Sequence, residues 1–212
     1  LLGAAGGLGE PFALKSAFAM GADFVVVGSV HQSTIEAGTS IRVKELLAMA
    51  TITDCSKGIA PDMFEQGASV QVLSKKTFYA TRSKKLYNMY RQYTGVSAIP
   101  KADLERIERQ IFQVSLQEVW NDVQRYWHAR DPQQLKRAKR EPKHQMALIF
   151  RWYLGNASRW AREGNPDRVK DYQIWCGPAM GAFNAWAKGT EFEQVENRSI
   201  VAIAFALLDE VL

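Results

Sequence analysis

Residues 1–9 read LLGAAGGLG and residues 21–29 read GADFVVVGS, and these two stretches decide the fold at the start of the chain. Each contains a short apolar run that is followed by glycine, which predicts a β-strand. The run at residues 24–27 is β-branched and too short for a helix, so it predicts a buried parallel strand. Between the two runs, Pro11 suits the first position of a helix and Gly21 suits its end. The order predicts one strand–helix–strand unit with a glycine at the carboxyl end of both strands.

The stretch after the second strand mixes several short elements. Ser40 is a suitable N-cap for a helix over residues 41–49. Residues 51–61 show no regular pattern, and a short helix is expected near residues 62–66. Residues 70–73, VQVL, fit either a lone strand or an extended segment. The pairing of this segment stays open.

A long helical region follows over residues 79–164. Ser115 and Glu118 form a capping box ahead of an apolar run. The DP pair at residues 131–132 opens a further helix, which the EP pair at residues 141–142 closes. Aromatic residues recur at helical spacing, which is more typical of a packed core than of a ligand site.

The chain ends in two predicted helices. The segment QIWCGP at residues 173–178 leads into a helix that includes Phe183 and Trp186. Asn197 is the expected N-cap of a final apolar helix over residues 200–211. That helix is far shorter than the ~20 residues that span a bilayer, so no membrane segment and no membrane partner are predicted.

The charge balance is mildly basic. Lys and Arg number 27 against 22 Asp and Glu in 212 residues, a formal net charge of +5. A solvated helix face and a docking patch for an acidic partner both explain the run KRAKR at residues 136–140. The docking candidates are Lys136, Arg137, Lys139 and Arg140. The run has no interleaved aromatic residues, which argues against nucleic acid as a partner.

The two cysteines, Cys55 and Cys176, lie far apart in sequence and form no CxxC pair. This spacing argues against a zinc site or a scaffold held by disulfides, and no metal is predicted. It fits a protein of the reducing cytoplasm.

The glycines at the two strand ends indicate an anion site. A glycine-rich turn between a strand and a helix exposes backbone N–H groups beside the positive end of the helix dipole. One such turn, at Gly6 and Gly7, is a weak signal, but the second, at Gly28 and Ser29 on the neighbouring strand, makes it more specific. Loops after strands seven and eight of (β/α)8 barrels often bind phosphate. A Rossmann site is disfavoured because the spacing is not GxGxxG.

The residues around these glycines, 4–9 and 21–32, resemble flavin barrels related to nitronate monooxygenases. The rest of the chain resembles the PfaD family of FMN-dependent enoyl reductases in particular. The blocks that carry this resemblance are IEAGTS at residues 35–40, APDMFEQG at 60–67, VQVL at 70–73, PKHQMAL at 142–148, RWYLG at 151–155 and DYQIWCGPAMG at 171–181. The resemblance implies a mostly helical α/β chain, with the last two strands of an FMN-binding TIM (β/α)8 barrel and an inserted helical domain.

The resemblance also implies a cofactor, a reaction and a partner. The positions that match FMN-binding residues are Ala5, Gly6, Gly7, Gly28, Ser29 and Gln32, with His31 a further candidate. The implied reaction is the NADPH-dependent reduction of 2-enoyl thioesters on an acyl carrier protein, in polyunsaturated fatty acid or polyketide biosynthesis. The catalytic residues are expected upstream of Leu1.

Three parts are expected along the chain. Residues 1–52 form the end of the flavin barrel with its phosphate loops, residues 53–165 the inserted helical domain, and residues 166–212 a helical segment that packs back on the barrel. Without further barrel strands, the chain alone is expected to bind FMN weakly or not at all, and to be inactive. Two alternatives stay open, which are a flavin oxidase like nitronate monooxygenase and a non-catalytic helical interaction module.

Overall fold

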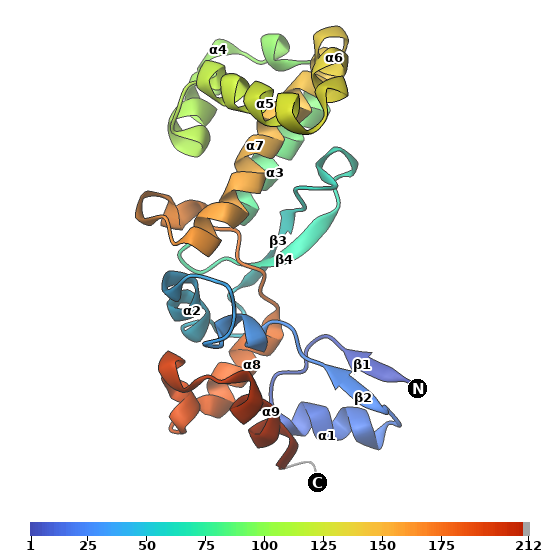
Figure 1. Cartoon of the computed structure of the whole chain (residues 1–212), viewed down its shortest axis with the longest axis vertical. Coiled ribbons are helices and arrows are strands. Elements are labelled where there is room, and N and C mark those ends of the chain that lie inside the picture. Colours follow the sequence, from blue (N-terminus) through green and yellow to red (C-terminus); the bar gives the residue numbers. More distant parts are fainter. Residues whose placement is uncertain (210–212) are drawn as a thin grey trace. The chain divides into compact units, whose positions relative to one another are not determined.

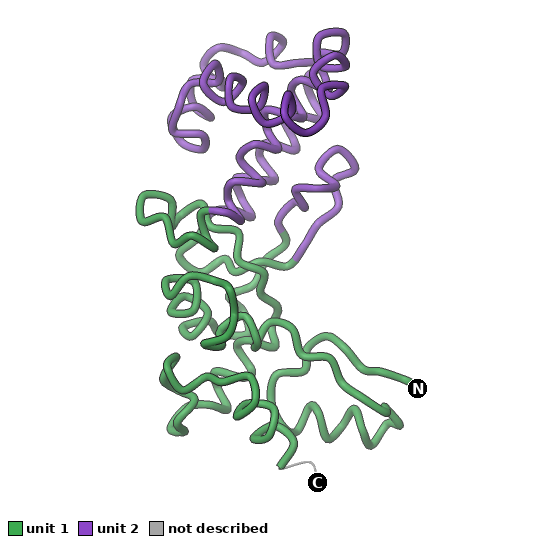
Figure 2. The backbone as a smooth tube through the Cα atoms, in the orientation of Figure 1, with its two compact units in different colours: residues 1–57, 71–77, 160–212 green, residues 58–70, 78–159 purple. Residues whose placement is uncertain are grey.

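A computed structural model describes residues 1–209 (Figure 1). The chain divides into two compact units (Figure 2). Unit 1 comprises Leu1–Lys57, Gln71–Thr77 and the chain from Trp160 onward, and unit 2 comprises Gly58–Val70 and Phe78–Arg159. Neither unit is one continuous segment, because the chain leaves unit 1 and returns to it twice.

Unit 1 begins with the predicted strand–helix–strand unit. Strands β1 (Gly3–Ala5) and β2 (Phe24–Val26) pair in parallel, and helix α1 (Pro11–Ala19) connects them. Pro11 occupies the start of α1, and Gly21 follows its end with a φ of +94°. A positive φ is readily adopted by glycine alone, so this residue ends the helix as expected.

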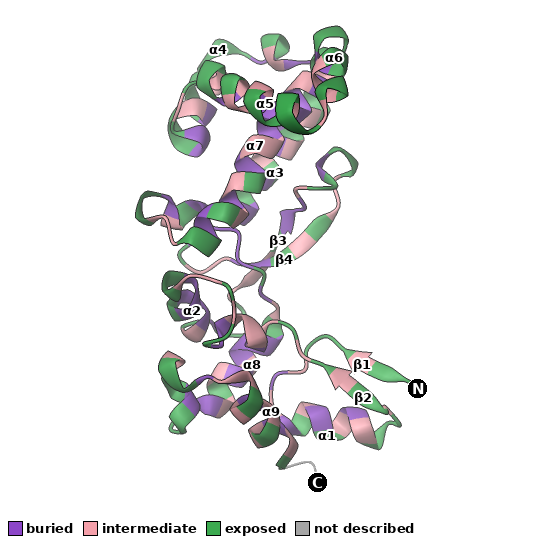
Figure 3. Cartoon of the chain, viewed as in Figure 1, coloured by how far each residue is buried: buried purple, intermediate pink, exposed green. Residues whose placement is uncertain are grey.

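The prediction that the second strand is buried is wrong for this chain. Phe24 and Val26 of β2 are 46% and 53% exposed, and much of β1 is exposed as well (Figure 3). The reason is that, within residues 1–209, β1 and β2 form a sheet of two strands only. Parallel sheets are stable when helices or further strands cover them, and these strands have little cover.

The remaining helices of unit 1 are α2 (Ile41–Ala48), α8 (Pro178–Ala187) and α9 (Ile200–Asp209). Ser40 caps α2 as predicted, because its hydroxyl accepts a hydrogen bond from the N–H of Val43 at 3.3 Å.

Asn197 is not the N-cap of α9, which corrects the sequence prediction. It ends a separate 3-10 turn, and its side chain donates to the carbonyl of Glu191. The N–H of Ile200 instead donates to the Glu36 carboxylate, at 3.0 Å and 3.1 Å from its two oxygens. Sequence spacing cannot reveal a cap that comes from so distant a residue. The predicted end of this helix at residue 211 lies outside the described residues.

A strand that sequence patterning missed lies in residues 51–61. It is β3 (Cys55–Ile59), and it pairs with β4 (Ser69–Leu73). The pairing resolves the open interpretation of residues 70–73. The turn between the strands contains a 3-10 turn at Phe64–Gln66, near the short helix expected there.

Unit 2 is helical, as predicted. Its helices are α3 (Tyr79–Gln92), α4 (Lys101–Ile107), α5 (Leu116–Arg130), α6 (Pro132–Arg140) and α7 (Pro142–Glu163). The Ser115–Glu118 capping box is present at the start of α5. Both proline boundaries of α6 also lie where the sequence placed them.

Aromatic side chains form the core of unit 2. Phe64, Phe112 and Phe150 are all fully buried. The ring centroid of Phe150 lies 6.3 Å from each of the other two rings. Tyr79 is also fully buried, and its hydroxyl donates to the carbonyl of Ile59 at 2.6 Å. The interpretation of the helical aromatics as core residues is confirmed at these positions.

Candidate functional site

The turn after β1 has the backbone conformation that its glycines suggested. Gly6 and Gly7 have φ values of +87° and +75°. A Cβ atom added to either residue would meet no atom within 4 Å. The requirement for glycine here is therefore conformational and not steric, since a side chain would have room but would strain the backbone. Ala5, the last residue of β1, lies exposed beside this turn.

The end of β2 differs from the end of β1. Gly28 does not have a positive φ, and a Cβ atom added there would also meet nothing within 4 Å. Neither backbone conformation nor packing among the described residues demands a glycine at this position. Open space beside a glycine backbone is what a closely approaching ligand needs.

The N-terminus of α8 adds a third element to the two strand ends, and sequence reasoning missed it. The hydroxyl of Ser29 accepts a hydrogen bond from the N–H of Gly177 at 2.9 Å. A Cβ atom on Gly9 would lie 2.0 Å from the carbonyl oxygen of Ala179, so the turn after β1 also packs on α8. Gly177 is the N-cap of α8, and no side chain caps this helix.

The start of α8 therefore brings partial positive charge to both glycine turns. A signal for it exists in the sequence, because Gly177-Pro178 places proline at the first helical position with no capping side chain before it. Its position beside Ser29 could not be read from the sequence, since 148 residues separate Gly177 from Ser29.

A buried arginine holds the segment that follows β2. Arg198 is 1% exposed, and its guanidinium donates to the hydroxyl of Ser33, the side-chain oxygen of Asn184 and the carbonyl of Phe192. Burial lowers the pKa of Arg198 to about 10, so it stays charged at neutral pH. Ser33 ends the 3-10 turn that begins just after Ser29. Arg198 is thus suited to hold, from within the core, the 3-10 turn that follows Ser29.

His31 and Gln32 lie in that 3-10 turn and are both partly exposed. Backbone hydrogen bonds hold the turn: the N–H of Gln32 donates to the carbonyl of Ser29 at 3.2 Å, and its carbonyl accepts from the hydroxyl of Thr39 at 3.1 Å. Within residues 1–209, neither side chain forms a hydrogen bond. The side chains of His31 and Gln32 therefore have no partner among the described residues that would keep them from a ligand.

The two cysteines, which are distant in sequence, lie together in unit 1. The sulfur atoms of Cys55 and Cys176 are 3.5 Å apart, and both thiols are free. Burial raises the pKa of both thiols, most strongly at Cys176. A protonated thiol is a poor nucleophile, so a packing role suits the pair better than a reactive one. Their contact joins the start of β3, at Cys55, to the segment just before α8, at Cys176.

The basic candidates on α6 are exposed, but they are not equivalent. Arg137 pairs with Glu141 at 2.8 Å. Lys136, Lys139 and Arg140 form no ion pair with any carboxylate of the described residues. The nearby Lys143 is partly buried, and its ammonium group donates to the carbonyls of Tyr90 and Tyr93 at the end of α3.

One buried histidine of unit 2 has an unusual environment. His144 is 3% exposed, its Nε2 lies 2.9 Å from the side-chain oxygen of Gln134, and its Nδ1 has no hydrogen-bond partner. The nearest Glu65 oxygen is 3.8 Å from Nδ1. Burial and the positive charge of Arg137 lower the pKa of His144 below its usual value, which favours the neutral ring.

Neither a metal centre nor a bilayer-spanning helix can be assigned in residues 1–209. No group of three or more His, Cys, Asp and Glu side chains gathers there in a way that could hold a metal ion. None of the helices in that range has both the length and the apolar character needed to cross a bilayer.

Comparison with known proteins identifies relatives for nearly the whole chain. The inserted helical domain of [acyl-carrier-protein] S-malonyltransferase matches residues 93–172. A polyunsaturated fatty acid synthase polypeptide of Thraustochytrium sp. is 46% identical over 191 residues, which is 89% of this chain and 13% of that protein. Polyketide biosynthesis protein PksE of Bacillus subtilis is 42% identical over 209 residues, which is 99% of this chain and 27% of that protein.

Two solved structures are also similar to this chain. The enoyl reductase domain of MlnA, from the macrolactin biosynthesis cluster of Bacillus amyloliquefaciens, is 38% identical and superposes with a TM-score of 0.93. The match covers 99% of this chain and 47% of that one. FabK of Thermotoga maritima has a TM-score of 0.52 at 17% identity, over 99% of this chain and 43% of its own, which shows a similar fold alone. The chain thus spans less than half the length of each of these proteins.

Proposed function

Since the chain belongs to the same family as these fatty acid synthase and polyketide biosynthesis proteins, we propose that it is the C-terminal part of a flavin-dependent enoyl reductase. The reaction is the reduction of 2-enoyl thioesters on an acyl carrier protein, with NADPH as the reductant and FMN as the cofactor. The observation that carries this proposal is the TM-score of 0.93, at 38% identity, to an enoyl reductase domain.

In this proposal β1 and β2 are the last two strands of a TIM (β/α)8 barrel. Their parallel pairing through α1 and their exposed faces both support it, because barrel strands are paired on each side and covered by helices. Residues 1–52 and 166–212 then belong with the barrel, and residues 53–165 form the inserted domain. Unit 2, from Gly58 to Arg159, lies inside that middle segment, although residues 71–77 group with unit 1.

The fit of an FMN phosphate can be tested on the residues present. Gly6, Gly7 and Gly28 present bare backbone, with room for a ligand where a Cβ atom would lie. The hydroxyl of Ser29 accepts from Gly177 and keeps its own hydrogen for a phosphate oxygen. The start of α8 adds helix-dipole charge of the sign that a phosphate dianion requires. These residues suit the group that the proposal assigns to them.

The roles of the protein residues follow from this arrangement. When bound, FMN supplies hydride-transfer chemistry. In the proposed roles, the glycine turns, Ser29 and the start of α8 would anchor its phosphate, and Arg198 would hold the turn that follows Ser29. His31 and Gln32 would contact the rest of the cofactor. The proton donor and the other catalytic groups are proposed to lie upstream of Leu1.

The relatives also support a partner, and the two cysteines support a location. They are components of fatty acid and polyketide synthesis systems, in which intermediates travel on carrier proteins. We assign an acyl carrier protein as the partner on this basis. The adjacent free thiols of Cys55 and Cys176 suit the reducing cytoplasm, where such a pair stays reduced.

The test uses the complete reading frame that contains this chain. The purified protein should carry a flavin absorption band that NADPH bleaches without oxygen, and an enoyl thioester should restore the band. Restoration by a nitronate or by oxygen alone would instead indicate an oxidase. A complete protein that carries no flavin and binds none would leave a non-catalytic interaction module.

A further inference from the structure

The basic excess of the chain is concentrated in one short segment. Residues 125–143 contain seven Lys and Arg against two Asp and Glu, a net charge of +5. The other residues hold 20 basic and 20 acidic side chains, since the whole chain has 27 and 22. The second half of α5 and all of α6 therefore carry the whole net charge of the protein. Such an accumulation on two adjoining helices calls for an explanation beyond solubility.

The surface of these helices is exposed (Figure 3). Lys136 and Arg140 are four residues apart and share one side of α6, and Lys139 lies beside them. At the end of α5, Arg130 stacks on the ring of Tyr126, 5.1 Å from its centroid, and Tyr126 is 50% exposed. We name the surface formed by Tyr126, Arg130, Lys136, Lys139 and Arg140 the α5–α6 surface.

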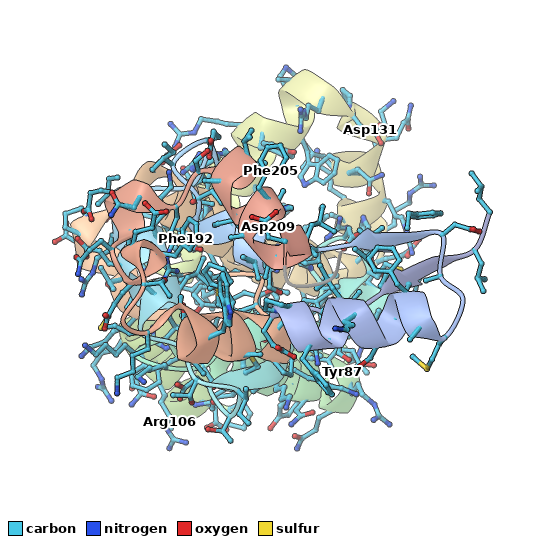
Figure 4. The ribbon with its side chains drawn as sticks, turned by 90° about the horizontal axis from the view of Figure 1, so that it is seen from below. Tyr87, Arg106, Asp131, Phe192, Phe205 and Asp209 are labelled. Carbon is cyan, nitrogen blue, oxygen red and sulfur yellow. The ribbon has the colours of Figure 1, made fainter. Side chains whose placement is uncertain are left out.

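The acidic residues of the segment do not neutralise this surface. Asp131 lies at the turn from α5 into α6 (Figure 4), where its carboxylate accepts hydrogen bonds from the N–H of Gln133 and the side chain of Gln134. Glu141 pairs with Arg137. Three cations, Lys136, Lys139 and Arg140, remain without a carboxylate partner in the described part of the chain.

Stabilisation of α6 accounts for only part of this charge. Cations near a helix C-terminus stabilise it, but each contributes only about 0.3–1 kcal/mol, and the effect is confined to the last turn. Arg137, Lys139 and Arg140 are in that last turn. Lys136 lies before it, and Arg130 belongs to α5, so the helix dipole of α6 does not explain either.

We propose that the α5–α6 surface is the docking site for the acidic face of the acyl carrier protein, an inference that rests on the proposed function. Tyr126 and Arg130 are exposed at the end of α5, and Tyr and Arg are residue types that contribute strongly to protein interfaces. The exposed cations of the adjoining α6 add the positive charge that an acidic partner requires. Opposite charges steer a carrier protein to this site and raise the association rate. Two nearby cations are not part of the proposed docking site. Arg137 pairs with Glu141, and Lys143 donates to the backbone carbonyls at the end of α3.

The experiment compares two triple variants of the complete protein. The first is Lys136→Glu, Lys139→Glu and Arg140→Glu. The matched control is Lys84→Glu, Lys101→Glu and Arg109→Glu, which makes the same charge change at exposed positions of the same unit. Each protein is assayed with a crotonyl thioester on a purified carrier protein and with crotonyl N-acetylcysteamine. Binding of the carrier protein is measured separately by fluorescence anisotropy.

We expect the first variant to raise the apparent KM for the carrier-bound substrate, and its Kd for the carrier protein, about tenfold at low salt. Its kcat and its KM for the small thioester should stay unchanged, and the difference from wild type should shrink in 1 M salt. The control variant should behave like wild type.

Equal effects of the two triple variants would overturn docking at this surface while leaving the enoyl reductase proposal intact. If the wild-type protein does not reduce the small thioester, the proposed function is wrong. The anisotropy measurement would still show whether the carrier protein binds to this surface. Binding of duplex DNA through these three cations, with no binding of the carrier protein, would replace the proposal by a nucleic acid site.

Discussion

The two units bury their large aromatic side chains to different degrees. In unit 2, Phe64 and Phe150 are fully buried among other rings. In unit 1, Phe12 of α1 is 74% exposed and Phe24 of β2 is 46% exposed. The helical unit therefore has a core of its own. The strand–helix–strand part of unit 1 instead leaves large apolar side chains exposed.

The largest expected effect separates these two kinds of phenylalanine. Phe150→Ala should destabilise the chain by about 3–5 kcal/mol, because it leaves a cavity among packed rings. Phe205→Ala should change the free energy of unfolding by less than about 0.5 kcal/mol, because this side chain of α9 is 65% exposed. Urea unfolding of both variants checks the difference. A cost at Phe205 equal to that at Phe150 would contradict the comparison.

Substitutions at two glycines test the difference between a closely packed position and an open one. A Cβ atom on Gly181 of α8 would lie 2.1 Å from the backbone nitrogen of Ile52, so Gly181→Ala should cost about 2–3 kcal/mol. Gly155 of α7 has no atom within 4 Å of an added Cβ. Gly155→Ala should therefore stabilise its helix by about 0.5–1 kcal/mol. Chemical denaturation measures both, and a stable Gly181→Ala protein would be inconsistent with the packing.

A substitution at Gly28 should weaken ligand binding and leave the stability of the fold unchanged. In the complete protein, Gly28→Ala should raise the Kd for FMN about tenfold, or about 1.4 kcal/mol, because the new methyl group occupies the ligand's space. The unfolding midpoint of the flavin-free protein should not move, since no described atom is close to that position. Gly38→Ala is the control, because Gly38 has equally open surroundings but lies outside the proposed site. Unchanged FMN affinity in Gly28→Ala would remove Gly28 from the site.

The smallest effect concerns the pH dependence of unit 2. Burial holds the pKa of His144 below that of the unfolded chain, so the unfolded state binds a proton first as the pH falls. The contribution of this residue to stability is complete above about pH 6.5 and decreases below it, towards the lower pKa of the folded state. His144→Gln should reduce the loss of stability between pH 7.5 and 5.5, measured by urea unfolding. His128→Gln, at an exposed position, should not.

Local signals were sufficient where neighbours in sequence are also neighbours in space. The capping box at Ser115 and the prolines at 132 and 142 set the limits of α5, α6 and α7, because caps and proline act within one helical turn. The glycine turns after β1 and β2 were predicted for the same reason. The assignment of FMN to those turns stays a prediction, supported by their geometry.

Tertiary structure alone decided which distant segments meet. It placed the start of α8 beside Ser29, joined Cys55 to Cys176, and buried Arg198 behind the turn after β2. It also paired β3 with β4 and left β2 exposed. The amino-acid sequence was enough for the limits of α5, α6 and α7 and for the family resemblance, because those depend on short-range patterns. It was not enough for the start of α9, which the distant Glu36 caps. Contacts between segments more than 100 residues apart depend on how the whole chain packs, which no local pattern encodes.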